Sequence, residues 1–382
     1  MEPFWDSISK ELLSIKNKNR FRETKTYKGI DFCSNDYLGL ASNSTLWKHA
    51  ESFDYFNRIG STASRLVRGN SEELERFESS FADFIGAEAS LVVNTGYVAN
   101  AGLIDAIGNP QTIIFSDRLN HASILDGIRI SGAIKKYFNH LDLDHLEVLL
   151  QKAEENEKEK DKRKIVVTET VFSMDGDIPD LKRLLRLKKH YGFVLVLDEA
   201  HSFGLFGKNG RGLVYDQLSK EEIEQIEYRV YTLGKSLGLF GGIIATSKLG
   251  RDHLVNVMRP FIFSTSLPPL IPHLAFYALD LLSKMDLERQ TTLELASIFK
   301  KRMNEMGYKT TDSVSQIIPV LMDSEADALA TAEILQAKGF DIRAIRPPTV
   351  ETARLRISFN AKITSIQVEE LLEIFKTIKE NH

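Results

Sequence analysis

The stretch Thr232-Leu-Gly-Lys-Ser-Leu-Gly, at positions 232–238, decides the fold that we expect for this chain. Its lysine, Lys235, stands between Gly234 and Ser236, just after a β-like run at 228–233. Most lysines are solvated surface residues, and that is the simpler interpretation. The alternative is an amine held in a tight glycine loop to form a Schiff base, because glycine lets the backbone pass close under a flat cofactor. Segments upstream must decide between the two.

Composition places the chain among ordinary globular proteins. It has 382 residues, of which 43% are hydrophobic and 27% charged, enough for a large core and two domains. The net charge of −4 gives no case for a nucleic-acid partner. Cys33 is the single cysteine, which fits a reducing compartment. The acidic start is unlike a signal peptide, and no apolar run approaches the roughly 20 residues of a membrane helix. We therefore expect a cytoplasmic protein that binds neither nucleic acid nor membrane.

Between about 75 and 247, helical patterns alternate with short apolar runs. Four such runs are uniformly apolar, at 91–94, 112–116, 165–169 and 193–198. Uniformly apolar strands separated by helices predict a mostly parallel central sheet with helices on both faces, an α/β fold.

The two ends of the chain show sequence patterns that differ from that of the central part. Residues 3–19 show the spacing of an amphipathic helix, whose apolar stripe is typical of a docking face. After Pro268-Pro269 the pattern predicts a long helix over 272–306 and then a smaller α+β domain. Its later elements are a strand at 317–321, a helix at 325–338, a strand at 354–359 and a helix at 364–380. We therefore predict an N-terminal helix and arm over 1–45, a large domain over 46–270 and a small domain over 271–382.

Asp198 closes the apolar run 193–197, so it should lie at the carboxyl edge of the sheet, where ligands bind in open α/β folds. A lone aspartate here is often a helix cap. The alternative is an aspartate that pairs with a pyridine nitrogen and makes pyridoxal phosphate an electron sink. His201, three residues later, could then reach the phenolic oxygen of the cofactor or the Schiff base.

Two predicted strand–helix turns carry further candidates. The N–H groups of Gly96 and Tyr97, at a predicted helix start, could hold a phosphate. His121 opens another helix and either stacks on a heteroaromatic ring or acts as a capping histidine. Competing motifs fail: Arg229 stands where a P-loop ending in 234–236 needs its first glycine. The nine histidines show no zinc spacing, so we expect no metal.

Taken together, the motifs are recognisable from about Asp31 to about Asn360. The sequence resembles the α-oxoamine synthases, a branch of the fold-type-I pyridoxal-phosphate enzymes. Besides the lysine loop, the matching segments are Ser34-Asn-Asp-Tyr-Leu-Gly-Leu, Ser64-Arg-Leu-Val-Arg-Gly-Asn, Asn94-Thr-Gly-Tyr-Val-Ala-Asn, Leu119-Asn-His-Ala-Ser, Thr168-Glu-Thr-Val-Phe-Ser-Met-Asp-Gly, Leu197-Asp-Glu-Ala-His, Phe263-Ser-Thr-Ser-Leu-Pro-Pro and Ile345-Arg-Pro-Pro-Thr-Val.

The resemblance implies pyridoxal 5'-phosphate as cofactor and a role for each matched residue. Lys235 would carry the Schiff base and move the α-proton. Asp198 would pair with the pyridine nitrogen, with His201 near the phenolic oxygen and His121 stacked on the ring. The remaining cofactor contacts would come from Gly96, Tyr97, Glu169, Ser173, Thr232, Thr265 and Ser266.

The same resemblance implies the substrate contacts and a homodimer. Arg356 would bind the amino-acid carboxylate, and Asn35 and Thr349 would contact substrate. Arg20 is the best match for an arginine that meets the acyl substrate, with Arg22 competing for that role. The segment 264–266 would reach the active site of the partner chain, so the two sites would be shared.

The implied activity is that of an acyltransferase: decarboxylative condensation of an amino acid with an acyl thioester. The most similar branch uses L-alanine and a pimeloyl thioester, on coenzyme A or a carrier protein, in biotin biosynthesis. The nearest rival joins glycine to an acetyl thioester, ahead of 5-aminolevulinate and sphingoid-base synthases and of a non-catalytic subunit. Two departures concern the acyl site. Glu351 alone separates Val350 from Thr352 where the family has a glycine-containing turn, and Thr62-Ala63 replaces a Gly-Gly pair.

Overall fold

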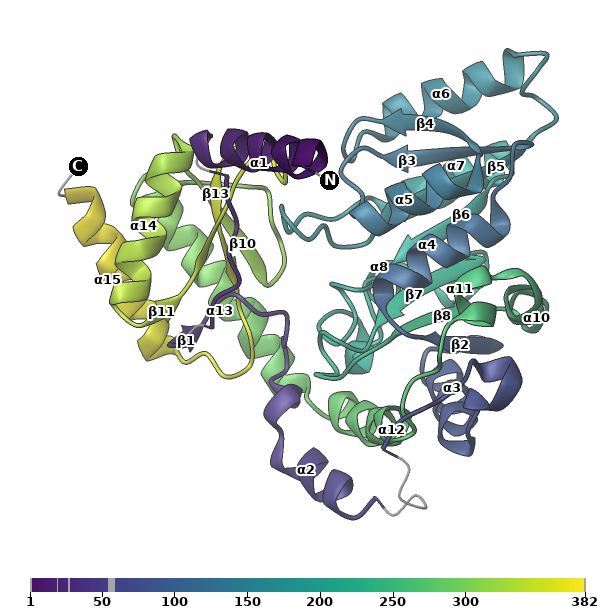
Figure 1. Ribbon diagram of the computed structural model, residues 1–382, viewed down its shortest axis with the longest axis horizontal. Coiled ribbons are helices and arrows are strands. Elements are labelled where there is room, and N and C mark those ends of the chain that lie inside the picture. The colour runs from purple at the N-terminus through teal and green to yellow at the C-terminus, as the bar shows by residue number, and fades with distance from the viewer. Residues whose placement is uncertain (1, 19, 27, 54–58, 381–382) are drawn as a thin grey trace.

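The computed structural model describes residues 2–18, 20–26, 28–53 and 59–380 and shows two packed units (Figure 1). The larger unit is built on a seven-stranded sheet with the strand order β2-β8-β7-β6-β5-β3-β4. Neighbouring strands from β4 to β7 are parallel, whereas β8 runs antiparallel to both β7 and β2. This confirms a mostly parallel central sheet. The strands are β2 (Ala89–Val93), β3 (Thr112–Asp117), β4 (Ile134–Phe138), β5 (Arg163–Glu169), β6 (Val194–Asp198), β7 (Tyr228–Thr232) and β8 (Gly242–Thr246).

Helices cover both faces of this sheet, as predicted. Alternate residues of one strand enter different cores: Val166 faces one cluster, and Ile165 and Val167 face the other. Both clusters exclude water from apolar side chains, each worth about 1.5–3 kcal/mol when fully buried. The helices of this unit are α2 (Ser44–Glu51), α3 (Glu72–Phe84), α4 (Gly96–Ile107), α5 (Ala122–Ser131), α6 (Leu143–Glu155), α7 (Leu181–Tyr191), α8 (Val214–Gln217), α9 (Lys220–Ile223), α10 (Lys248–Val257), α11 (Arg259–Phe263) and α12 (Leu270–Ser283).

The smaller unit is a four-stranded antiparallel sheet packed against helices. Its strand order is β12-β13-β10-β9. The chain before α2 also belongs here, because β1 (Ile30–Asp31) pairs with β11 (Phe340–Asp341) and Phe32 joins the core of this unit. The other elements are α13 (Asp286–Glu305), β9 (Lys309–Thr310), β10 (Ile317–Leu321), α14 (Glu325–Ala337), β12 (Arg343–Ile345), β13 (Arg354–Ser358) and α15 (Ser365–Glu380).

The single helix expected over 272–306 is wrong: it is two helices, α12 and α13, with a break at 284–285. The Leu282 carbonyl accepts a hydrogen bond from Arg289 Nη2 at 2.6 Å. Met285 leaves the helical region, with φ −93° and ψ 44°, and Asp286 starts the second helix. A buried arginine therefore caps α12. The apolar side of α12 lies in a core of the large sheet, and the division at residues 45 and 270 stays a prediction.

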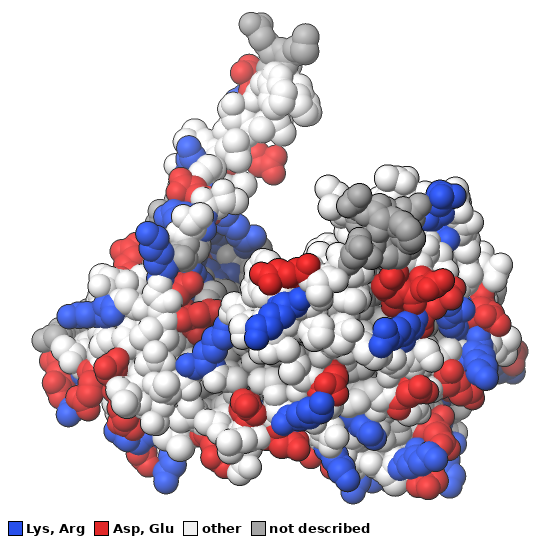
Figure 2. Space-filling model, turned by 90° about the horizontal axis from the view of Figure 1, so that it is seen from below, with Lys and Arg blue, Asp and Glu red and all other residues white. Residues whose placement is uncertain are grey.

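The N-terminal helix is confirmed as α1 (Glu2–Asn17). It stands clear of the body as an arm (Figure 2). Phe4 and Trp5 are about three-fifths exposed, at 62% and 61%, so within this chain nothing covers the expected docking face among the described residues. No helix in the described ranges is both long and apolar enough to cross a bilayer.

Candidate active site

The lysine loop closes on itself at the end of β7. Leu233 N donates to Gly241 O at 3.0 Å, and Gly238 N donates to Lys235 O at 2.8 Å. Gly238 has φ +64°, and a Cβ there would lie 2.2 Å from the backbone nitrogen of Ala41, so only glycine fits. The loop thus holds the lysine backbone rigidly at the carboxyl edge of the sheet.

Two carboxylates lie beside the Lys235 amine. Glu169 and Asp198 end neighbouring strands and stand opposite each other in register. Burial lowers the pKa of Lys235 to about 8, against the opposing pull of Asp198 and Glu169. Burial, reinforced by Asp198, raises the pKa of Glu169 to about 8. Near neutral pH the neutral amine that nucleophilic chemistry requires is therefore more abundant at Lys235 than at an ordinary lysine.

Asp198 is held by neighbours that the sequence did not single out. Its Oδ2 accepts from Asn100 Nδ2 at 2.6 Å, and its Oδ1 accepts from Ala200 N at 2.9 Å. Asn100 lies on the buried face of α4 and also donates to Ser123 Oγ at 3.1 Å. The sequence signal for this contact was Asn100 itself, an amide on an otherwise apolar helix face. Two hydrogen bonds leave lone pairs of the carboxylate free for a protonated ring nitrogen.

His121 has the capping role, one of its two predicted roles, and its stacking on a ring stays a prediction. Its Nδ1 caps α5 by accepting from Ser123 N at 3.3 Å and lies 2.7 Å from Ser123 Oγ. The backbone N–H of His121 donates to Glu169 Oε1 at 2.7 Å. Burial lowers the pKa of His121, and Lys235 adds to this while Asp198 opposes it. The ring is therefore neutral at pH 7 and its orientation is fixed by the cap, which suits stacking on a ring.

A second network links the remaining polar candidates. Arg356 Nη2 donates to Asn35 Oδ1 at 3.0 Å, and Arg356 Nε donates to the Ser173 carbonyl at 2.6 Å. The Tyr37 hydroxyl lies 3.0 Å from Asn35 Oδ1 and 2.6 Å from His201 Nδ1. Burial, with Lys235 and Arg356, holds the pKa of His201 well below its usual value. Tyr37, within a quoted motif, was missed because nothing local indicates its partner.

A set of hydroxyl and N–H groups gathers at the start of α4. A Cβ on Gly96 would lie 2.3 Å from Thr232 Cγ2, so the helix start and β7 touch there. Within the described part of the chain, the buried hydroxyls of Thr232 and Ser266 have no hydrogen-bond partner. Asn94 Nδ2 donates to the Thr265 carbonyl at 2.7 Å. Unpartnered donors beside a helix N-terminus fit a phosphate group.

Tyr97 is the least constrained of the expected phosphate contacts. Its side chain is 44% exposed, and its hydroxyl donates to Asp126. Its ring meets that of His121 edge-on, with centroids 6.2 Å apart. The backbone of Tyr97 belongs to the helix start described above, whereas its side chain borders the place expected for the cofactor ring.

The candidates for acyl recognition surround a separate cavity of about 720 Å³. Arg22 Nη2 donates to Thr349 Oγ1 at 3.2 Å, while Arg20 pairs with Glu325 at 2.9 Å. Glu351, at the shortened turn, pairs with Arg118 on the surface. Five cationic side chains and two acidic ones line the cavity: Arg20, Arg22, Lys25, Arg343 and Arg346, with Glu23 and Glu333. Arg20, Lys25 and Arg343 form ion pairs with Glu325, Glu23 and Asp341.

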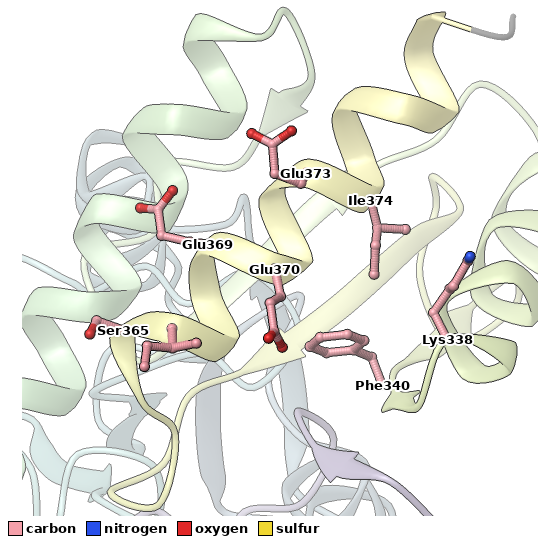
Figure 3. Close-up of a pocket in the computed structure, with 8 residues that line it drawn as sticks. Lys338, Phe340, Ser365, Glu369, Glu370, Glu373 and Ile374 are labelled. Carbon is pink, nitrogen blue, oxygen red and sulfur yellow. The ribbon is translucent and has the colours of Figure 1, made fainter.

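Another hollow, of about 680 Å³, lies on the outer side of the small unit against α15 (Figure 3). Apolar Phe340 and Ile374 and acidic Glu369, Glu370 and Glu373 line it. None of the predicted site residues lies there, so the candidate active site is the loop cluster at the sheet edge.

The family model described as aminotransferase class I and II matches residues 27–375. Among curated relatives, "Putative 8-amino-7-oxononanoate synthase" of Bacillus mycoides (strain KBAB4) is 38% identical over 351 residues, covering 92% of this chain and 85% of the relative. The protein of the same name from Bacillus cereus (strain G9842) is 39% identical over 330 residues, covering 86% and 82%.

The chain is also similar to solved structures of two kinds of enzyme. Serine palmitoyltransferase of S. paucimobilis, with a bound PLP–myriocin aldimine, has a TM-score of 0.88 at 26% identity, covering 98% of this chain and 97% of that one. The Sphingomonas wittichii serine palmitoyltransferase reaches 0.85 at 29%, covering 91% and 86%. The 8-amino-7-oxononanoate synthase of Francisella tularensis reaches 0.78 at 27%, covering 92% and 98%.

Proposed function

Because the chain belongs to the aminotransferase class I and II family, and within it to the α-oxoamine synthases, we propose that it condenses L-alanine with a pimeloyl thioester. The products are 8-amino-7-oxononanoate, carbon dioxide and free thiol, in biotin biosynthesis. The single observation that carries the proposal is Lys235, with its lowered pKa, beside Asp198 at the sheet edge. The names of the curated relatives support the substrate pair.

The residues present fit pyridoxal 5'-phosphate. The unpartnered hydroxyl of Thr232 and the start of α4 would take the phosphate. Asp198 would hold a proton on the ring nitrogen, and His121 would cover one ring face. When bound, the cofactor supplies an electron sink for charge that develops at the amino-acid Cα.

On the amino-acid side, Arg356 would bind the carboxylate of alanine by a charge-assisted hydrogen bond. Asn35 and the Ser173 carbonyl hold its guanidinium in place. Lys235 Nζ then removes the α-proton and later returns one, as a base with a pKa near the working pH does well. Neutral His201, hydrogen-bonded to Tyr37, would present Nε2 toward the cofactor oxygen.

On the acyl side, Arg22 with Thr349 is our choice for the distal carboxylate of the pimeloyl chain. Their side chains meet at the cationic cavity, whereas Arg20 is already paired with Glu325. We also propose that Arg20, which lines the same cavity, contributes to acyl recognition. A carboxylate that enters there would meet Arg22, which donates to a hydroxyl and not to a carboxylate, and an acetyl group could not use this charge.

Serine with a long acyl thioester is the second candidate. It is favoured by the fold comparison, in which two serine palmitoyltransferases have higher TM-scores than the 8-amino-7-oxononanoate synthase. Glycine with an acetyl thioester is the remaining alternative within the family. We also propose a cytoplasmic homodimer in which the segment 264–266 completes the partner's site.

A direct test incubates the purified, cofactor-loaded protein with L-alanine and pimeloyl-CoA and identifies the product by mass. We expect 8-amino-7-oxononanoate, and none from the Lys235→Ala variant. Repeating the assay with a pimeloyl carrier protein identifies the carrier. If the wild-type protein forms no amino ketone from either donor, the proposed substrate pair is wrong.

A further inference from the structure

His140 bridges two carboxylates outside the set of residues used above. It follows β4, and its Nδ1 lies 3.0 Å from Asp117 Oδ1 while its Nε2 lies 3.0 Å from Asp177 Oδ2. Ionised carboxylates only accept hydrogen bonds, so both ring nitrogens must carry protons and the ring is an imidazolium. Burial by itself would lower the pKa of His140, but the bonds and charges of the two aspartates raise it to about 10.

On one side of this bridge, Asp117 shapes the turn that leads to His121. Asp117 is the last residue of β3 and is fully buried. Besides His140, it accepts from the backbone N–H groups of Leu119 and Leu141, both at 2.8 Å. Leu141 has φ +54°, a left-handed conformation that residues other than glycine rarely adopt. The backbone thus adopts an unfavourable conformation where His140 and Leu141 both reach Asp117.

On the other side, Asp177 closes the loop 172–177. Phe172 N donates to the Asp177 carbonyl at 3.0 Å, and Gly176 N donates to the Phe172 carbonyl at 2.8 Å. The Phe172 ring also packs edge-on against His140, with centroids 4.4 Å apart. Inside this loop lies Ser173, whose carbonyl accepts from Arg356. The loop therefore supplies one of three partners that hold the guanidinium of Arg356, beside Asn35 and Ser358.

The loop also holds a second arginine of β13. Arg354 Nη1 donates to Asp175 Oδ1 at 2.6 Å and to the Met174 carbonyl at 3.0 Å. The bridge at His140 is thus the far anchor of a loop whose near side fixes both arginines of one strand. It joins the edge of the large sheet to the small unit through hydrogen bonds.

We propose that His140 is a positioning residue for amino-acid binding: it ties the loop 172–177 to Asp117 and so places the Ser173 carbonyl that orients Arg356. The identity of the ligand at Arg356 rests on the proposed function, whereas the bridge itself does not. His140 touches neither substrate nor cofactor. Its loss should weaken amino-acid binding more than cofactor binding.

The test compares His140→Gln with His253→Gln, an exposed histidine on α10. In cofactor-loaded protein, the dissociation constant of L-alanine is measured from the absorbance change of the bound cofactor. We expect it to rise roughly tenfold in His140→Gln, because a charge-assisted contact is lost. The cofactor dissociation constant should change less than about twofold, and His253→Gln should match the wild type. An unchanged alanine constant in a folded His140→Gln variant would overturn the proposal.

Two further measurements keep the proposal testable if that variant does not fold. Asp177→Asn retains a side-chain oxygen as acceptor and should raise the alanine constant by a smaller factor; no change would count against the bridge. Nitrogen NMR of histidine-labelled protein, with or without cofactor, should show both His140 nitrogens protonated at pH 8, and a neutral ring would contradict it. If the wild type binds neither alanine, serine nor glycine, the proposed function fails, while the NMR result still decides the bridge.

Discussion

The sheet edge that we propose for the cofactor and the cavity that we propose for the acyl chain differ in how firmly their side chains are held. Asp198 and Glu169 are 5% and 2% exposed, and each accepts backbone or side-chain hydrogen bonds. The ion pair of Arg20 with Glu325 has side chains 37% and 30% exposed. Polar groups buried in this way are costly to leave without partners, whereas exposed ion pairs contribute only about 0–1 kcal/mol.

This difference shows which parts of the sequence constrain function most. At the cofactor end, a change in one residue leaves a buried partner unsatisfied, so the chemistry tolerates little variation. At the acyl end, arginines on an open cavity can be exchanged or re-paired at small cost. Substrate choice is therefore the less securely encoded part of the function.

The largest effect is expected for Lys235→Ala. Removing the amine that lies beside Asp198 and Glu169 should lower kcat by roughly a thousandfold or more, because both the covalent attachment and the α-proton transfer depend on it. Borohydride treatment of the wild type should fix the cofactor to Lys235, as peptide mass mapping would show. Finding the adduct on a different lysine would contradict the role of Lys235 at the cofactor site.

Asp198→Asn should have the next largest effect. The amide cannot hold a proton on the ring nitrogen, and a lost charge-assisted contact costs on the order of 1.5–3 kcal/mol, or roughly ten- to a hundredfold in rate. We expect cofactor retention with a kcat reduced to that extent. Asn100→Ala, which removes one hydrogen bond to the same carboxylate, serves as the matched variant and should lose less. Turnover near the wild-type value in Asp198→Asn would make this aspartate merely structural.

At the open end, Arg22→Ala should raise KM for the pimeloyl substrate about tenfold and leave alanine binding unchanged. Arg20→Ala should give a smaller rise, because Arg20 supports the cavity through its pair with Glu325. Steady-state kinetics at saturating alanine measure both. A larger effect from Arg20 than from Arg22 would restore Arg20 as the direct acyl contact.

The smallest expected effect is a pH dependence of the rate of cofactor uptake. Because burial lowers the pKa of Lys235 to about 8, the rate at which apoprotein takes up cofactor should rise with pH and level off above about 8. An ordinary lysine would keep gaining neutral amine up to about 10.4. Since Asp198 opposes this shift, Asp198→Asn should move the midpoint further down. A midpoint near 10 in wild type would contradict the rigid, desolvated site.

The sequence predicted the elements whose signal is local. Apolar runs such as 165–169 and 193–198 became buried strands, and the loop with Lys235 lies where the motif placed it. It did not predict contacts between distant positions. Asn100 meets Asp198 across 98 positions, and Tyr37 meets His201 across 164. The break between α12 and α13 was also missed. The guanidinium that caps α12 belongs to Arg289, which lies after the break in the sequence, so the residues before the break do not indicate it.

The most direct test of the central claim is a competition assay. The protein is supplied with alanine, glycine or serine, each with pimeloyl, acetyl or long-chain acyl thioesters, and kcat/KM is measured for every pair. We predict the highest value for L-alanine with the pimeloyl thioester. A higher kcat/KM for serine with the long-chain donor, or for glycine with the acetyl donor, would contradict the account and assign the chain to that other α-oxoamine synthase activity.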